Sequence, residues 1–587
     1  MKCAWSGLLL ALCAASLVVA QEKVVVHEVG ERRICTIRVA PFAGSEEPGG
    51  FGWFLVDVQN HERTAHAVLV DVSTTAWSAG DFGMQRTIAL GPEEQARFYL
   101  PLPNVERATL ELTTRVDGSA QSALLDVPST RGCVGLVVGD RANLQPPALA
   151  MLQAVVTGRK CSMVGCSGLD VPADWRLFTG FPFVAVDGRS PLGADAQDAL
   201  RRYVCAGGRV VVGSAGSLPP GPLRERLERL PALASRAEGL GTWVAVDDLA
   251  TASRIAEQVG ALLGTNPELW PLPAALQKLQ PVPGLGRAPV LVFLLVILCF
   301  AVVTGPVNFF LLRKWRRPLL ALVTVPALGF GTTLLMLGYG FLHDGFGVRG
   351  AVRSWTLLDQ TEHTAVATAS RTLFAGLSPD SLSLGADAML IAPATLGRRD
   401  RRNPNRFQFS ADTNRIDGAV LPSRTPTVLT TAQQGVVRDR LRVRVRPEGG
   451  LELLADGGIR LLGEILVRDR DGACWLGKAP VLQPCTLEQA EQYVSALGVA
   501  AGHLATMEDD YDSEYDYRRY TMSEPVADER GVAALSRRWL GSGGPEAGTW
   551  YGRVQQAPWL DDHGIQVDYD LQEHFVIGRL AAEDIVR

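Results

Sequence analysis

The chain has 587 residues, a formal net charge of −5 and a hydrophobic content of 47%. This length leaves room for several domains, and the apolar content is sufficient to build real hydrophobic cores. Because the net charge is small for the length, it argues against a polyanionic partner, and we expect no nucleic-acid binding.

The N-terminus predicts a secretory signal peptide over residues 1–20. Lys2 gives a positive start, an apolar core follows over 8–19, and Ala20 is a small residue before Gln21. An uncleaved anchor helix is the alternative interpretation. If the signal is cut, the mature chain begins outside the cytoplasm.

Residues 21–130 predict a β-sandwich. Short runs that alternate apolar and polar residues are separated by turn residues, without helical patterns between them. Trp53 and Phe54 are candidate core anchors. His61 and His66 could suggest a metal site, but the sequence supplies no third ligand, so we expect surface or turn histidines.

Residues 131–265 predict an α/β domain. Apolar runs at 134–138, 183–186, 209–212 and 242–246 alternate with helical patterns, of which 194–205 is the clearest. This alternation is typical of a mainly parallel sheet that is covered on both faces.

Three polar residues follow strands of this predicted sheet: Asp140, Asp187 and Ser214. Open α/β sheets bind ligands at the carboxyl ends of their strands. These residues are therefore the candidate ligand-binding residues of the domain.

A linker rich in proline and glycine, 266–289, leads to two apolar runs, 290–312 and 319–342, that carry no charged side chain. Each run exceeds the ~20 apolar residues that a helix needs to cross a bilayer. We expect two transmembrane helices that enter the lipid bilayer as a hairpin.

The connector between the two runs, 313–318, is strongly cationic. Its charged residues are Arg313, Lys314, Arg316 and Arg317. The positive-inside rule places such a loop in the cytoplasm, so the segments on either side of the hairpin should be extracytoplasmic.

Gly305, Pro306 and Asn308 interrupt the first apolar run near its cytoplasmic end. Glycine and proline weaken a helix, and neighbouring helices can satisfy the backbone groups that this frees. We expect a packing device, in which Asn308 bonds to the second span, rather than part of a pore.

Residues 343–587 are again rich in strand patterns and predict a periplasmic β-rich domain. Leu441, Val443 and Val445 alternate with arginines, which gives one apolar and one cationic face. The acidic run 508–516 lacks the spacing of a calcium-binding EF-hand loop, so a solvated loop is favoured.

Ten cysteines are present, and three of them lie in the predicted signal or the first span. Cys474 and Cys485 are the best disulfide candidates, because they bracket a segment that could form a hairpin, and Cys161 and Cys166 come next. The cysteine spacing matches no zinc motif, and we expect no metal or cofactor.

The hairpin and the α/β region resemble a known group of bacterial inner-membrane proteins. The resemblance rests on the run 305–313, the basic connector, a proline at 326 in the second span, and the segments 178–186 and 198–212. Proteins of this group carry a periplasmic class I glutamine amidotransferase-like domain. The resemblance implies an inner-membrane location with both large segments in the periplasm. It also implies partners such as integrin-like von Willebrand A-domain membrane proteins and a chaperone-type ATPase.

Glutamine amidotransferases use a cysteine in a Gly-x-Cys-x-Gly turn that a histidine activates. The corresponding turn of this chain, 213–216, has no cysteine and does not carry a glycine at both flanking spacings. Ser214 lies in this turn, but no histidine lies between His66 and His343. Cys166, in the run 165–168, also misses the pattern. We therefore expect a catalytically inactive domain, with Ser214 as a weak nucleophile candidate.

The sequence thus predicts a multidomain α/β plus all-β protein with a membrane hairpin. The expected function is a non-enzymatic envelope scaffold or sensor whose periplasmic domains bind other envelope components. A periplasmic hydrolase or amidotransferase-like enzyme acting at the α/β domain is one alternative. A glycan- or peptidoglycan-binding protein is the other, for which the candidate platform residues are Trp355, Trp475, Trp550 and Trp559.

Overall fold

The computed structural model describes residues 23–29, 32–41, 50–74, 82–103, 110–125, 133–139, 161–181, 183–228, 230–249, 256–263, 290–316, 318–385, 387–391, 405–409, 414–418, 420–447, 449–502, 545–560 and 564–586.

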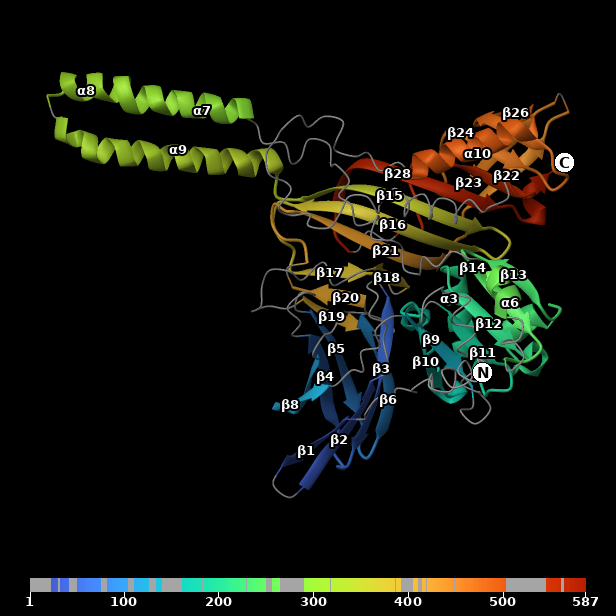
Figure 1. Ribbon diagram of the computed structural model, residues 1–587. Helices are drawn as coiled ribbons and strands as arrows, with labels where there is room; N and C mark the ends of the chain where they lie inside the picture. Colours follow the sequence, from blue (N-terminus) through green and yellow to red (C-terminus); the bar gives the residue numbers. More distant parts are fainter. Residues whose placement is uncertain are drawn as a thin grey trace, which may run out of the picture.

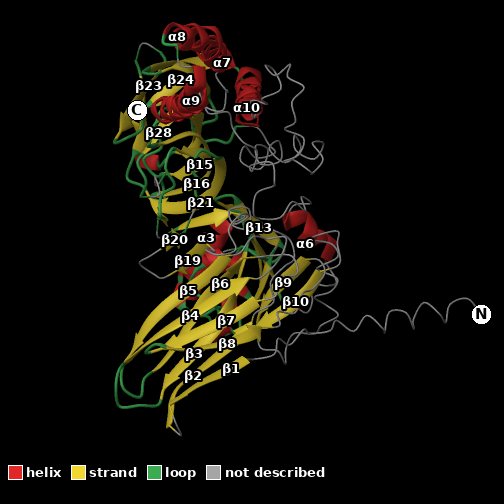
Figure 2. Ribbon diagram, turned by 90° about the vertical axis from the view of Figure 1, so that its left-hand side faces the viewer, coloured by secondary structure: helices red, strands yellow, loops and turns green. Residues whose placement is uncertain are grey.

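The N-terminal region contains two mainly antiparallel sheets that pack face to face (Figure 2). The first sheet has the order β1 (Lys23–Val29), β2 (Arg32–Pro41), β3 (Phe51–Asn60), β6 (Gln95–Pro103). Alternation along β3 buries Val56 and Val58, which share one core with Val70 of the second sheet. Trp53 and Phe54 are 1% and 0% exposed, so their predicted place in the core is confirmed.

The second sheet combines strands from both sides of the apolar hairpin. Its order is β17 (Ser381–Leu384), β20 (Asn414–Asp417), β19 (Asn405–Phe409), β5 (Phe82–Leu90), β4 (His66–Thr74), β7 (Leu110–Val116), β8 (Ser119–Leu125). Strand β19 runs parallel to β5. The predicted separation of a sandwich over 21–130 from a domain over 343–587 is therefore wrong, because the later segment completes the sheet of the earlier one.

The α/β region forms a mainly parallel sheet, as the alternating pattern predicts. Its order is β10 (Cys161–Cys166), β9 (Cys133–Val138), β11 (Val184–Asp187), β12 (Arg209–Gly213), β14 (Gly241–Val246), β13 (Ala234–Glu238), with β13 antiparallel at one edge. Its helices are α3 (Ala194–Cys205), α4 (Pro222–Leu227) and α6 (Ala256–Leu263). Val184 packs in the core that includes α3, and Ala185 packs in the one that includes Val259 of α6, so both faces are covered.

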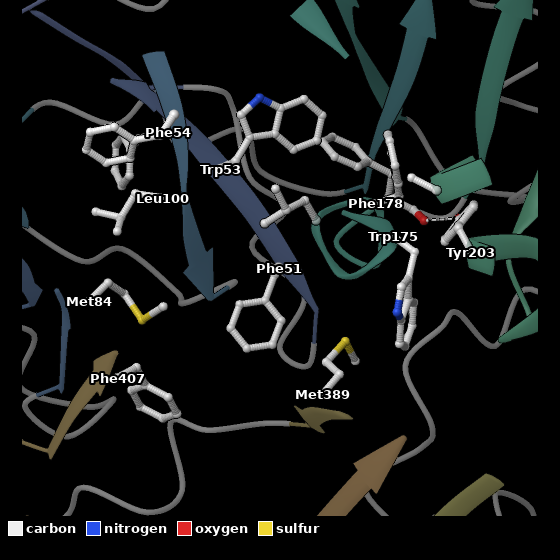
Figure 3. Packing of buried hydrophobic residues seen from close by; sticks show 14 of the residues in the cluster. Phe51, Trp53, Phe54, Met84, Leu100, Trp175, Phe178, Tyr203, Met389 and Phe407 are labelled. Atoms are coloured by element: carbon white, nitrogen blue, oxygen red, sulfur yellow. Dashed lines mark hydrogen bonds between the residues drawn. The ribbon is translucent and has the colours of Figure 1, made fainter. Parts of the chain in front are cut away.

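A single core joins the α/β region to the sandwich (Figure 3). Trp53 of β3 makes edge-on contacts with Phe178 and Phe181, with ring centroids 5.9 and 5.5 Å apart. The backbone of Phe51 donates a hydrogen bond to Thr179 Oγ1 at 3.1 Å. These contacts bury large aromatic surfaces of both regions, which favours one rigid body over loosely linked modules.

A long sheet carries most of the C-terminal region (Figure 1). Its order is β18 (Ala388–Ile391), β21 (Pro426–Val436), β16 (Thr364–Ala375), β15 (Val348–Asp359), β28 (Val567–Arg579), β27 (Thr549–Val554), β24 (Leu461–Arg468), β25 (Cys474–Lys478), β26 (Val481–Cys485), β23 (Leu451–Asp456), β22 (Arg440–Val445), β29 (Ile585–Val586). In β22, Leu441 and Val443 are buried as predicted, but Val445 is 40% exposed. Helix α10 (Leu487–Gly502) packs Val494 against this sheet.

Ion pairs connect this sheet region to the α/β region. Arg202 of α3 contacts Asp387 at 2.6 Å, and Arg226 of α4 contacts Glu362 at 2.8 Å. The parts that precede and follow the hairpin therefore touch through polar contacts as well as through the shared core.

The hairpin itself projects away from the sheets (Figure 1). Helix α7 (Val290–Val302) continues through a π-helical turn (Val303–Val307) into α8 (Asn308–Lys314), and α9 (Ala321–Asp344) returns beside it. The described residues thus include two helices that are long and apolar enough to cross a membrane.

Candidate functional site

The carboxyl edge of the parallel sheet brings two of the predicted ligand-binding residues onto neighbouring strands. Asp187 ends β11, and Ser214 follows the adjacent strand β12. The loops that leave these strands touch, because Gly188 N–H donates to the Gly213 carbonyl at 2.8 Å. A Cβ atom at Gly188 would lie 2.3 Å from the Ser214 carbonyl oxygen, so only glycine permits this approach. Asp140, the third candidate, lies outside the described residues.

The Ser214 hydroxyl is engaged by the backbone. Its Oγ donates a hydrogen bond to the carbonyl oxygen of Asp247 at 2.9 Å. In the part of the chain that the structure describes, neither a histidine nor a carboxylate contacts this hydroxyl. A carbonyl accepts a hydrogen bond but cannot remove the proton, so the residues that the structure describes provide no general base for Ser214.

Cys166 and Cys205 of this domain are buried and poorly suited to nucleophilic attack. Burial raises the pKa of the Cys205 thiol to about 12, and its Sγ donates to Glu238 at 3.7 Å. Cys166 is 3% exposed and donates to the carbonyls of Ser167 and Asp170. Because the thiolate is the reactive form, a buried and protonated thiol is inert.

Glu238 is the centre of a charged cluster that the sequence patterns did not predict. It accepts a hydrogen bond from Trp243 Nε1 at 2.8 Å and pairs with Arg226 at 2.7 Å, while Arg201 lies 3.8 Å away. Glu238 is 8% exposed, and a buried carboxylate needs such partners to offset its desolvation. The cluster therefore connects β13 to α3 and α4 through charged contacts.

The hairpin brings together residues that the sequence predicted to pack. Asn308 Nδ2 donates to Thr324 Oγ1 of α9 at 3.0 Å, and the Thr324 hydroxyl lies 3.1 Å from Asn308 Oδ1. The predicted bond from Asn308 to the second span is therefore confirmed. The sequence did not lead us to predict Thr324 as the partner, although a hydroxyl group within an apolar run is a candidate for such a hydrogen bond.

Gly305 and Pro306 lie in the π-helical turn, which separates α7 from α8. Proline lacks an N–H and its ring clashes with the carbonyl four residues earlier, which widens the helix at this point. Of the predicted cationic connector, Arg313, Lys314 and Arg316 are exposed, and Arg317 lies outside the described residues.

The two proposed cysteine pairs differ in geometry. Cys474 and Cys485 lie opposite each other on the antiparallel strands β25 and β26, with both thiols free. Cys161 and Cys166 are the two ends of one strand, β10. Because a strand rises ~3.3 Å per residue, their Cα atoms are far beyond the ~7 Å limit for a disulfide, and that predicted pair is wrong.

The aromatic residues proposed as a glycan platform face inward or are partly covered. Trp355 and Trp550 are 1% and 0% exposed. Trp475 and Trp559 are half-buried, and their indole N–H groups donate to Asp469 and Thr356. These four side chains therefore form no exposed stacking surface.

The histidines of the sandwich bond within the protein. His61 Nε2 lies 2.8 Å from Thr36 Oγ1, and His66 contacts Glu62 and Asp117. Among the described residues, no group of three or more histidine, cysteine, aspartate or glutamate side chains is placed to hold a metal ion.

Comparisons with known proteins add little to this geometry. No family model matches the chain, and no curated protein matches it. Solved structures with local likeness include a protein from Archaeoglobus fulgidus, with 12% identity over 18% of this chain and 90% of that chain and a TM-score of 0.10. A Paenibacillus cycloisomaltooligosaccharide glucanotransferase has 9% identity over 30% of this chain and 38% of that chain, with a TM-score of 0.13. An exo-chitosanase from Amycolatopsis orientalis has 15% identity over 33% of this chain and 22% of that chain, with a TM-score of 0.11. This chain spans well under two thirds of either enzyme, and scores this low support no conclusion about fold or function.

Proposed function

We propose that the protein is a non-enzymatic scaffold or sensor of the bacterial inner membrane, whose periplasmic body binds other envelope components. The observation that carries the proposal is the parallel pairing of β19 with β5. One strand follows the hairpin and the other precedes it, so both must lie on the same side of the membrane. A hairpin that crosses the membrane twice meets this requirement. The cationic connector then predicts that the turn of the hairpin lies in the cytoplasm.

The site geometry supports a non-enzymatic role. Ser214 lacks a base among the described residues, and burial keeps the Cys205 thiol protonated. The wide contact between regions, with the Trp53 aromatic cluster at its centre, favours a rigid body for presenting surfaces to partners. From the resemblance, a von Willebrand A-domain membrane protein is the expected kind of partner.

Topology is tested with alkaline phosphatase fusions. An enzyme fused after Leu342 should be active, because that end faces the periplasm, whereas a fusion after Trp315 should be inactive. The reverse pattern would overturn the membrane placement.

The scaffold role is tested by crosslinking in native membranes. Membrane or envelope proteins should be captured, and Ser214→Ala, Cys166→Ala and Cys205→Ala should each leave the cellular phenotype intact. Capture of only a soluble substrate-processing complex, or loss of function in one of these variants, would argue against the proposal.

A hydrolase acting at the carboxyl edge of the sheet is the second candidate. The observation that favours it is the left-handed backbone of Ser214, with φ 52° and ψ 49°, directly after a parallel strand. Strained turns of this kind present nucleophilic serines in known hydrolases. Labelling of the full chain by a fluorophosphonate probe, abolished in Ser214→Ala, would support this candidate, and absence of labelling would remove it.

A further inference from the structure

The membrane hairpin contains a pocket at its cytoplasmic end. The pocket has a volume of about 840 Å³ and lies where the π-helical turn and α8 face the start of α9. This volume is within the range of ~300–1,000 Å³ that is usual for small-ligand sites. Phe309 and Leu312 line it from α8, and Val325 lines it from α9.

Local chemistry explains why the two helices leave this space. Pro306 prevents regular helix hydrogen bonding and produces the π-helical turn. Gly305 contributes no side chain, and a Cβ atom built there meets no atom within 4 Å. The Asn308–Thr324 hydrogen bonds hold α8 against α9 beside the pocket. The pocket is therefore present while the two helices are in contact.

The mouth of the pocket is cationic. Arg313 and Arg316 are both exposed and both belong to its lining. The sequence contains no acidic residue between Glu268 and Asp344, so no neighbouring carboxylate along the hairpin can neutralise these guanidinium groups. Guanidinium groups bind phosphate through paired hydrogen bonds, and basic pockets between membrane helices on the cytoplasmic side suit anionic lipid headgroups.

We propose that this pocket binds one anionic phospholipid of the cytoplasmic leaflet. The phosphate lies between Arg313 and Arg316, and an acyl chain occupies the apolar space beside Gly305 and Phe309. The charge at the mouth and the apolar lining together match an amphiphile with an anionic head. A transmembrane helix from a partner would fill the apolar part but would leave the two arginines without an anion. The proposal rests on the membrane placement of the proposed function.

The test uses the full-length chain, purified in a nonionic detergent and titrated with phosphatidylglycerol or phosphatidylcholine of identical acyl chains. Bound lipid is counted by native mass spectrometry. Phosphatidylglycerol should bind preferentially with one lipid per chain, and Arg313→Gln or Arg316→Gln should each weaken it by about fivefold. Lys314→Gln is the matched control: it removes one charge from the same turn, but Lys314 does not line the pocket.

A second variant tests the apolar part. Gly305→Leu keeps every charge and places its side chain in open space, so it should block lipid binding without unfolding the hairpin. Equal binding of the two lipids, equal losses in Lys314→Gln and Arg313→Gln, or complete displacement by inorganic phosphate would overturn the proposal. A change in oligomeric state in Gly305→Leu with lipid binding intact would instead identify the pocket as a helix-packing surface, and would also overturn it.

The two proposals can fail separately. Fusions that place Trp315 in the periplasm would refute the membrane placement. Normal fusions combined with lipid binding that is insensitive to Arg313→Gln and Arg316→Gln would refute only the lipid site.

Discussion

Phe407 lies directly beside Met84 in adjacent parallel strands, although the two residues are separated in the chain by both apolar helices. Both side chains are buried, at 2% and 0% exposed, in the core that also holds Trp53 (Figure 3). This contact makes the halves of the chain on either side of the hairpin parts of one folded body.

Phe407→Ala should destabilise this body as a whole. Truncating a buried phenylalanine typically costs about 3–5 kcal/mol, because apolar contacts are lost and a cavity remains. The melting temperature of the purified full chain should fall clearly. Val436→Ala is the control, because Val436 is 80% exposed on β21. Equal melting temperatures for the two variants would contradict a shared core.

Two substitutions at Ser214 should differ in how much they change stability. A left-handed backbone costs a non-glycine residue about 1–2 kcal/mol, so Ser214→Gly should relieve strain that partly offsets the lost hydrogen bond to Asp247. Ser214→Ala keeps the strain and loses the bond, which costs about 1 kcal/mol. Ser214→Gly should therefore melt at a higher temperature than Ser214→Ala, and the opposite order would show that the positive φ carries no cost.

Cys474 and Cys485 should form a disulfide when the protein matures in an oxidising compartment. Residues that face each other across antiparallel strands have Cα atoms ~4.5–5.5 Å apart, which is within the range of disulfides. Peptide mapping of protein alkylated without reduction should recover these two cysteines as one linked pair. Cys205, which is buried against Glu238, should be recovered unlinked in the same map. Recovery of Cys474 and Cys485 as separate alkylated thiols would contradict the prediction.

His574 should make stability dependent on mildly acidic pH. Burial, with a smaller effect of Arg371, lowers the pKa of its ring from 6.5 to about 4, and Ser354 Oγ lies 2.8 Å from Nδ1. Between these values the unfolded chain binds one more proton than the folded one, so stability falls as the pH drops from 6.5 towards 4. The loss should reach about 2 kcal/mol at pH ~5.

The measurement is the melting temperature as a function of pH. His574→Gln should be less stable at neutral pH but should show a flatter profile across this window. An unchanged slope in His574→Gln would assign the pH dependence to other groups.

Asn308 and Thr324 should stabilise the hairpin as a pair. Hydrogen bonds between membrane helices contribute about 0.6 kcal/mol on average and up to about 1.7 kcal/mol. A double-mutant cycle with Asn308→Ala and Thr324→Ala, measured by melting in detergent, should give a coupling energy in this range. Thr333, whose hydroxyl bonds to its own helix at Gly329, supplies a control pair with Asn308 that should show no coupling.

The sequence by itself determined the elements whose signals are local. The apolar runs around 290–342 specify membrane-length helices, since length and lack of charge are sufficient. The 3.6-residue pattern of α3 and the alternation around Leu441 likewise predict a helix and a strand from neighbouring residues.

Only the tertiary structure decided how these elements associate. The pairing of β19 with β5 joins residues more than three hundred positions apart, and no local pattern encodes a partner at that distance. The same holds for the hydroxyl of Ser214, whose hydrogen-bond acceptor is the Asp247 carbonyl at the end of a neighbouring strand. It also holds for the pocket that Gly305 and Pro306 form with α9. Local periodicity reflects which face of an element is buried, whereas strand order, hydrogen-bond partners and cavities depend on packing between distant segments.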